Sequence, residues 1–439
     1  MPLSTLLYLN ELYRLRRNVR LGIAQLERIQ YKKLKRLINY AYNNVSYYRR
    51  LLTQAGISPA DIKTKADISK IPITAKSQIQ SLPREEITSR GVDIKDCLYF
   101  KTSGSTGEPL TIILSEREYI IVGLFSLRMQ LENSYHVMDK MVCINEPQYI
   151  RKRKRWFHYL GIGNVEYISC FENTEEQVEK ILKIKPQVIK GRVSSIKALA
   201  LEMERSNIDH INPKLIFCTA EFLDKKDREL ISTIFDCEVI DYYSTTECGN
   251  IAWECREHKG YHIDADNVVV EFIKNGSMVP AGEEGEIIIT VLNNYTMPLI
   301  RYKIGDTGIL GERPCPCGIS LPLLETLGGR INDQIILPNG KVLLPYLLLN
   351  IIEGITGIVK YQIVQEGIGS LKVSIVKNEK FSLDSLAQIK RRYREAMGYG
   401  VEVEPIIVDE ILQEKGRKFK LIVSEFSKDE DLRKVSDIR

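Results

Sequence analysis

The sequence contains no long apolar run. None of its 439 residues lies in a stretch that approaches the roughly 18 uninterrupted apolar residues of a membrane-spanning helix. A secretory signal is also missing, because residues 1–29 mix charges with apolar positions at helical spacing and offer no cleavage site. The nine cysteines form an odd, scattered set, which argues against a disulfide framework. We therefore expect a reducing compartment, the cytoplasm.

The sequence also lacks a strong excess of one charge. Its 62 basic and 57 acidic residues leave a net charge of +5, which does not call for a nucleic-acid partner. A hydrophobic content of 44% and a charged content of 27% are typical of globular proteins, and no internal repeat is present. The length exceeds what one hydrophobic core supports, so we expect a large domain and a smaller one.

The order of apolar segments predicts an α/β fold. Residues 1–95 form a largely helical preamble, and short apolar runs then alternate with amphipathic stretches. Such alternation predicts βα units around a largely parallel sheet with flanking helices. Four of these runs occupy 141–145, 186–191, 215–221 and 238–244.

Beyond residue 265 the sequence changes to strand-like segments separated by Gly, Asn and Pro turns, which predicts a β subdomain. We place a domain boundary at Gly328-Gly329-Arg330. Residues 1–328 then form the large domain, and residues 329–439 form a small α+β domain with a helix at 383–397.

One loop combines hydroxyl side chains with glycine directly after the apolar segment 97–100. Glycines let the backbone approach an anion, and hydroxyls donate hydrogen bonds to it, so the composition suits phosphate. No lysine follows the second glycine, so the loop is not a Walker A motif. Taken alone, such a stretch is more often a flexible surface turn. The loop consists of Thr102, Ser103, Gly104, Ser105, Thr106 and Gly107.

Three further motifs follow in a fixed order: Tyr243-Ser244-Thr245-Thr246-Glu247, then Arg301-Tyr302-Lys303-Ile304-Gly305-Asp306, then Gly329-Arg330-Ile331-Asn332-Asp333. With the hydroxyl-rich loop they resemble the core motifs of the adenylate-forming superfamily. Residues 45–79 in turn resemble the opening of phenylacetate-CoA ligases and of CapK-like capsular polysaccharide biosynthesis proteins. The resemblance extends over essentially the whole chain.

The resemblance implies a nucleotide site for ATP. Its phosphate loop would hold the β- and γ-phosphates, Tyr243 would pack on adenine, and Thr246 would hydrogen-bond the α-phosphate. Glu247 would hold Mg²⁺, and Asp306 would accept hydrogen bonds from the ribose. For Asp306 a turn residue, and for Glu247 a structural ion pair, remain as alternatives.

Other positions of the implied nucleotide site are less sharply defined. Arg330 would assist at the ribose, and Ala220 with Glu221 would lie on the adenine side. Ser244 and Thr245 complete the segment after Tyr243, although Ser244 stands where the superfamily often has glycine.

A lysine near the end of the chain would stabilise the adenylation transition state in such a family. It would belong to a small, mobile C-terminal domain that swings in for one half-reaction and out for the other. Lys418 occupies that place, although Arg417 stands where glycine is expected. The alternative is a solvated basic loop.

Cysteines and histidines form a second candidate site. Cys255 and His262 are followed much later by Cys315 and Cys317, and three thiolates with one imidazole suit tetrahedral zinc. Some phenylacetate-CoA ligase relatives bind zinc with such residues. His258 competes with His262 for the histidine position. The alternative is a set of reduced side chains without metal.

The reaction that the resemblance implies is adenylation of a small-molecule carboxylate by ATP and Mg²⁺, followed by transfer of the acyl group to CoA. A first alternative is transfer to an amine or a sugar during surface polysaccharide synthesis. A second is a non-catalytic nucleotide-binding protein. The sequence identifies neither the carboxylate nor the oligomeric state, for which a dimer is one option.

Overall fold

The structure, a computed structural model, describes residues 3–102, 109–145, 163–330, 335–338, 342–343, 348, 351–352, 355–397, 400–411 and 421–424. The chain divides into two compact units. The first comprises Met1–Gly104, Glu108–Ile304 and Ile309–Thr326, and the second comprises Leu327–Arg439 with the short segments Ser105–Gly107 and Gly305–Gly308. Across the described residues, no helix combines the length and the apolar character that crossing a membrane would require.

The first unit opens with helices. The α-helices are α1 Leu3–Asn18, α2 Ile23–Asn44, α3 Ser46–Gln54, α4 Lys76–Gln80 and α5 Arg84–Ile87, and the 3₁₀ turns are Pro59–Asp61, Ala66–Lys70 and Ile94–Asp96. Helix α2 buries one apolar stripe that includes Leu26, Leu34 and Leu37, at the spacing of one helix face. A hairpin of β1 Leu98–Lys101 and β2 Thr111–Leu114 follows.

The centre of the first unit is one mixed sheet. Within the described residues it contains twelve strands in the order β11-β10-β12-β13-β14-β9-β8-β7-β6-β5-β3-β4. Its parallel strands are β3 Met141–Asn145, β4 Val165–Ser169, β5 Val188–Arg192, β6 Leu215–Thr219 and β7 Glu238–Thr245. The remaining strands are β8 Gly249–Glu254, β9 Tyr261–Ile263, β10 Val268–Lys274, β11 Ser277–Met278, β12 Glu284–Val291, β13 Tyr302–Leu310 and β14 Leu323–Arg330.

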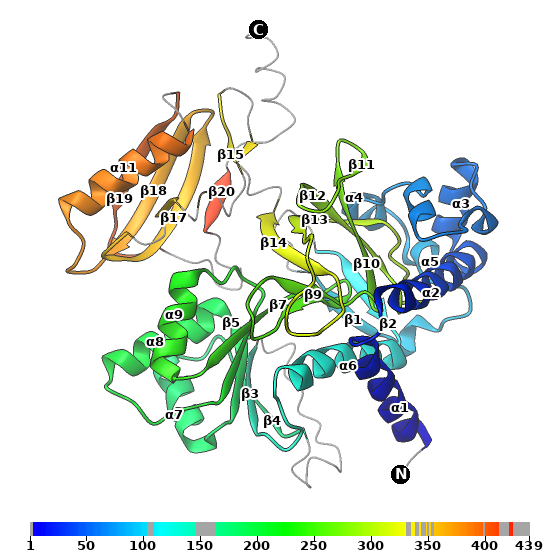
Figure 1. Cartoon of the computed structure of the whole chain (residues 1–439), viewed down its shortest axis with the longest axis horizontal. Coiled ribbons are helices and arrows are strands. Elements are labelled where there is room, and N and C mark those ends of the chain that lie inside the picture. Colours follow the sequence, from blue (N-terminus) through cyan, green and yellow to red (C-terminus); the bar gives the residue numbers. More distant parts are fainter. Residues whose placement is uncertain are drawn as a thin grey trace. The chain divides into compact units, whose positions relative to one another are not determined.

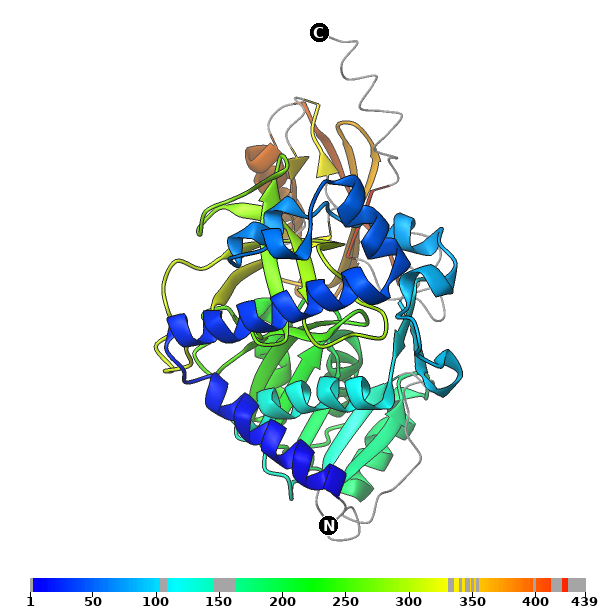
Figure 2. The same cartoon turned by 90° about the vertical axis from the view of Figure 1, so that its right-hand side faces the viewer.

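Helices cover both faces of the parallel part, which confirms the predicted α/β class. On one face α7 Thr174–Ile184, α8 Val193–Arg205 and α9 Lys225–Phe235 pack on Val142, Ile189 and Ile216 (Figure 1). On the other face lies α6 Glu116–Glu132, with α1 beside it (Figure 2). The β-rich part continues the same sheet through the antiparallel pair β7–β8.

The second unit contains an α+β set, as predicted. Strands β17 Ile358–Gly367, β18 Ser370–Lys377, β19 Glu402–Ile407 and β20 Ile422–Ser424 form a sheet in the order β19-β18-β17-β20. Helix α11 Leu383–Met397 packs on it through Ile389 and Tyr393, which are fully buried together with Ile363 and Val373. The short strands β15 Ile335–Ile336 and β16 Val342–Leu343 pair with each other.

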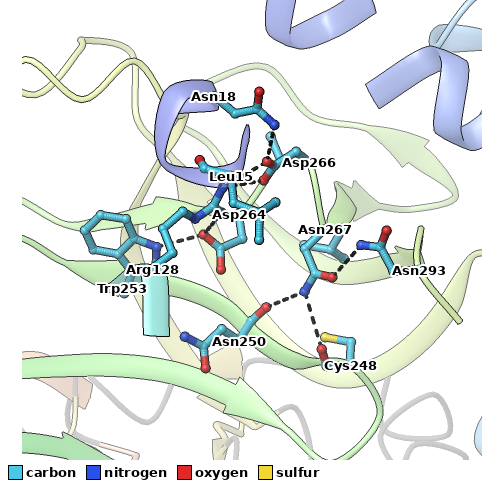
Figure 3. A network of polar contacts seen from close by, with 12 residues as sticks. Leu15, Asn18, Arg128, Cys248, Asn250, Trp253, Asp264, Asp266, Asn267 and Asn293 are labelled. Carbon is cyan, nitrogen blue, oxygen red and sulfur yellow. Dashed lines mark hydrogen bonds and ion pairs between the residues drawn. The ribbon is translucent and has the colours of Figure 1, made fainter. Parts of the chain in front are cut away.

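A fully buried ion cluster connects α1, α6 and the segment between β9 and β10. The Arg128 guanidinium donates to the Asp264 carboxylate and, at 2.9 Å, to both oxygens of Asp266 (Figure 3). Asn18 Nδ2 donates to Asp266 at 2.7 Å, and Trp253 Nε1 donates to Asp264 at 2.7 Å. Burial alone would lower the pKa of Arg128, but the two carboxylates outweigh it and raise the pKa. The guanidinium therefore stays charged.

Replacing Arg128 tests how far the first unit depends on this cluster. Arg128→Met leaves two carboxylates buried without their shared cation, which we expect to cost about 3–5 kcal/mol in the free energy of unfolding. Urea unfolding followed by tryptophan fluorescence measures it, because Trp253 is part of the cluster. As a control, Arg14→Met removes only an exposed ion pair with Glu11 and should cost less than about 1 kcal/mol. Equal urea midpoints of unfolding for Arg128→Met and Arg14→Met would contradict the stabilising role of the buried ion cluster.

Candidate active site and metal centre

The predicted nucleotide segment lies where β7 ends. Tyr243 is buried, and the β7–β8 ladder is irregular between Tyr243 and Ser244, so the strand bends there. Ser244 has no positive φ, which agrees with a serine where glycine is common. Its hydroxyl lies 3.1 Å from the Thr219 hydroxyl, which also donates to the Tyr242 carbonyl at 3.0 Å. The ends of β6 and β7 are thereby joined.

The segment after β6 is held by a helix cap. Ala220 adopts φ 71°, and the Glu221 carboxylate accepts hydrogen bonds from Ser194 N at 2.7 Å and from Ser194 Oγ at 3.0 Å. Ser194 lies in the first turn of α8, where backbone N–H groups lack partners within the helix. Glu221 therefore fixes the start of α8. The sequence did not reveal this bond, because the two residues lie 27 positions apart.

The second and third predicted motifs meet at Glu247. The Tyr302 hydroxyl donates to the Glu247 carboxylate at 3.4 Å, and Tyr302 is almost fully buried at the start of β13. Burial, and then the Glu247 charge, raise the pKa of Tyr302, so the hydroxyl stays protonated and donates. Two backbone hydrogen bonds to Thr74 hold the start of this strand. Thr74 N donates to Arg301 O at 2.8 Å, and Lys303 N donates to Thr74 O at 3.0 Å. Asp306 follows within β13 and is buried.

The remaining predicted nucleotide residues are described only in part. Thr102 pairs with Leu110, because its N–H donates to Leu110 O and its hydroxyl accepts from Leu110 N, both at 2.9 Å. Arg330 is the last residue of β14. Two sets of predicted residues lie outside the described residues, namely Ser103, Gly104, Ser105, Thr106 and Gly107 of the loop, and Lys418.

Four predicted metal ligands come together. The ligand atoms of Cys255, His262, Cys315 and Cys317 all lie within 4.8 Å of one another. Cys255 Sγ is 3.6 Å from Cys315 Sγ, and Cys317 Sγ is 3.3 Å from His262 Nε2. Cys255 follows β8, His262 lies in β9, and both other cysteines lie between β13 and β14. The pairing of β9 with β8 and with β14 brings the three segments together.

The donor set fits a zinc ion. Burial raises the pKa of the Cys255 thiol to about 12 and lowers the pKa of His262 to about 4. Without a cation the cluster therefore holds a thiol and a neutral imidazole, whereas a divalent ion stabilises the thiolates and uses the neutral imidazole directly. Ile319 N donates to Cys317 Sγ at 3.4 Å, which supports charge on that sulfur.

His258, the alternative histidine, interacts with carboxylates instead. Its Nδ1 lies 3.3 Å from Glu254 Oε2, and its Nε2 lies 2.7 Å from Glu238 Oε1. The hydrogen bond to Glu254 raises the pKa of His258, burial opposes this, and Glu238 adds to the rise. The histidine within the cluster of cysteines is His262.

A buried polar network joins the segments that carry the Cys/His cluster to β7. Glu254, the residue before Cys255, accepts two hydrogen bonds from Arg228 at 2.8 Å and one from Asp241 N at 2.9 Å. Tyr261, the residue before His262, donates to Asp241 Oδ2 at 2.8 Å. The sequence motifs do not predict this network. The sequence does contain a sign of it, because Asp241 and Glu254 are acidic residues within two apolar runs, where a buried carboxylate needs a partner.

Comparisons with known proteins show what this chain is similar to. The CapK C-terminal domain family matches residues 335–425. The phenylacetate-coenzyme A ligase of Thermus thermophilus is 25% identical over 383 residues, which cover 81% of each chain. CapK of Staphylococcus aureus is 24% identical over 64% of this chain and 62% of its own. The chain is a homologue of phenylacetate-CoA ligases and of CapK.

Solved structures show the fold of this homologue. 2-Hydroxyisobutyryl-CoA ligase, in the postadenylation state with an acyl-AMP, superposes with a TM-score of 0.79 over 96% of this chain and 94% of its own. Sequence identity in that alignment is 17%, so the likeness establishes the fold. The fold is that of the adenylate-forming enzymes.

Asp241 gives the first unit a pH-dependent stability. Burial, and then the Glu254 charge, raise the pKa of Asp241 to about 7. A carboxyl with a raised folded-state pKa contributes most stability below its unfolded pKa, and that stability is lost as the pH rises through about 7. Asp241→Asn keeps the shape and removes the charge, so it should stabilise by up to about 4 kcal/mol near pH 8 and by less than half of that near pH 5.

Thermal unfolding at the two pH values measures this effect. Asp236→Asn is the matched control, because Asp236 is exposed in the turn before β7 and its left-handed backbone suits asparagine. At both pH values, Asp236→Asn should unfold at nearly the same temperature as the wild type. A loss of stability in Asp241→Asn near pH 8 would show that the ionised carboxylate is favourable.

Proposed function

We propose that this protein uses ATP to convert a carboxylate into an acyl-adenylate and then transfers the acyl group to CoA. The contact between Tyr302 and Glu247 carries the proposal, because it joins two motifs that lie 55 residues apart. It does so within a fold that 2-hydroxyisobutyryl-CoA ligase shares over 94% of its own length. The homology to phenylacetate-CoA ligases supports CoA as the acceptor.

The residues at the end of β7 have the chemistry that adenylation needs. Glu247 would hold Mg²⁺, whose charge offsets the repulsion between the phosphates and the attacking carboxylate. The Tyr302 hydroxyl keeps the Glu247 side chain oriented. Thr246 would donate to the α-phosphate, Tyr243 would pack on adenine, and Asp306 would accept from the ribose. Catalysis of this kind consists mainly of positioning and charge stabilisation.

The C-terminal part would complete the site as a lid. We propose residues 1–328 as the adenylation domain and residues 329–439 as the lid, with Lys418 as the cation that stabilises the transition state. The match of residues 335–425 to the CapK C-terminal domain supports the lid assignment. It also favours a second candidate, transfer of the acyl group to an amine or a sugar of a surface polysaccharide.

Exchange of labelled pyrophosphate into ATP tests adenylation, with a broad panel of carboxylates. We expect exchange with at least one acid, and we expect Glu247→Gln to reduce it at least about 100-fold, because a metal ligand is lost. Glu229→Gln is the control, since Glu229 is an exposed glutamate of α9. AMP release that depends on added CoA separates the two acceptors. ATP binding without exchange for any acid would indicate a non-catalytic nucleotide-binding protein.

We further propose that Cys255, His262, Cys315 and Cys317 hold a structural zinc ion. Three sulfurs and one imidazole nitrogen within 4.8 Å of one another support this assignment. The ion would tie the segment after β8 and β9 to the connection before β14. None of the nine cysteines forms a disulfide bond, which suits the reducing cytoplasm that we propose as the compartment.

Metal analysis of protein purified without chelator should find one zinc ion per chain. The double variant Cys315→Ser/Cys317→Ser and the variant His262→Gln should each lose it, because a tetrahedral site needs all four ligands. His258→Gln and Cys97→Ser should retain full zinc, since neither side chain belongs to the cluster. Zinc loss in His258→Gln but not in His262→Gln would reverse the histidine assignment. Substoichiometric zinc in the native protein would contradict the site.

A further inference from the structure

Lys190 is an internal cation beside the candidate active site. It lies in β5, and its side chain is on the face of the sheet that α6 covers. Its Nζ lies 3.2 Å from Ser126 Oγ of α6 and 4.8 Å from the centre of the Tyr242 ring. Cys143 of β3 is its neighbour across the strand pair. These partners are a hydroxyl, an aromatic face and a thiol.

Lys190 differs from three internal arginines of the first unit. Arg128 pairs with two aspartates, Arg228 with Glu254, and Arg301 with Glu271. Among the described residues, no carboxylate forms an ion pair with Lys190, whose partners are those named above. Internal cations in proteins are normally matched by an anion, because desolvation of a lone charge is costly. The lysine is half-buried, so a bound ligand can supply that anion.

The position of Lys190 relates it directly to adenylation. Tyr242, whose ring it contacts, immediately precedes Tyr243 of the nucleotide segment. Thr219 links the Tyr242 carbonyl to the Ser244 hydroxyl at the carboxyl ends of β6 and β7. Ligands of α/β sheets bind at the carboxyl ends of parallel strands. Lys190 lies two residues before the end of β5, on the α6 side of the sheet and close to this edge.

We propose that Lys190 selects a carboxylate substrate that carries a second anionic group, such as a dicarboxylate. The inference rests on the proposed adenylation. The ammonium would donate a charge-assisted hydrogen bond to the second anion, with Ser126 holding the lysine in place. A substrate with an apolar end would leave the ammonium desolvated and without an anionic partner, so the same residue would reject it.

Pyrophosphate exchange with matched pairs of acids tests this inference. In each pair the terminal methyl group of the monoacid is replaced by a carboxylate: butyrate and succinate, hexanoate and adipate, 4-ethylphenylacetate and 1,4-phenylenediacetate. In at least one pair we expect the diacid to exceed the monoacid in kcat/KM by about 10- to 100-fold. Lys190→Met should abolish that preference mainly by lowering the value for the diacid, while the KM for ATP stays the same. Lys190→Arg should restore part of the preference, because it restores the charge.

Lys183→Met is the matched control, since Lys183 is an exposed lysine of α7, and it should keep the preference of the wild type. Unfolding temperatures of all variants show whether they are folded. Exchange with monoacids alone, or a diacid preference that survives in folded Lys190→Met, overturns the role of Lys190 and leaves adenylation intact. No exchange with any acid, despite ATP binding, overturns the proposed function and this inference with it.

Discussion

The ion cluster of Arg128, Asp264 and Asp266 is the constraint on which the rest of the first unit depends. It joins two helices that are distant in sequence to the segment after β9, with no exposure of the three side chains. Buried ion pairs are weak evidence for stability, because desolvation offsets much of their attraction. Their effect here is geometric, since only one register of β8 places Trp253 within hydrogen-bond distance of Asp264.

Strand β8 transmits that register to both candidate sites. Successive side chains of a strand face opposite sides of the sheet, so Trp253 and Cys255 face the ion cluster and the metal ligands, while Glu254 faces Asp241. On β9, His262 pairs with Trp253 and Tyr261 pairs with Glu254, so these two side chains also face opposite sides of the sheet. A slip of one residue would therefore disrupt the Cys/His cluster and the hydrogen bond of Glu254 to β7 together.

Local sequence was sufficient to predict elements whose periodicity is strong. The segment 141–145 is β3, the segment 238–244 lies within β7, and the helix predicted at 383–397 is α11. The grouping of Cys255, His262, Cys315 and Cys317 was also predictable, because few cysteines and histidines are available to form such a cluster. The joining of the parallel and antiparallel parts into one sheet was not, because it depends on long-range strand pairing. The bonds of Glu221 and Glu254 also escaped prediction, because each joins segments far apart in sequence.

In an adenylating site, selectivity between carboxylate substrates has to come from residues that contact the acyl group. ATP is common to every adenylation, so the contacts with ATP that we propose for Tyr243, Thr246 and Glu247 would not distinguish one carboxylate from another. Discrimination by apolar shape alone is limited to about 1–3 kcal/mol per methylene, whereas a polar group that loses its partner is penalised much more strongly. The first unit neutralises Arg128, Arg228 and Arg301 with its own carboxylates and offers none to Lys190 among the described residues. That asymmetry is what a site needs if it is to recognise its substrate by charge.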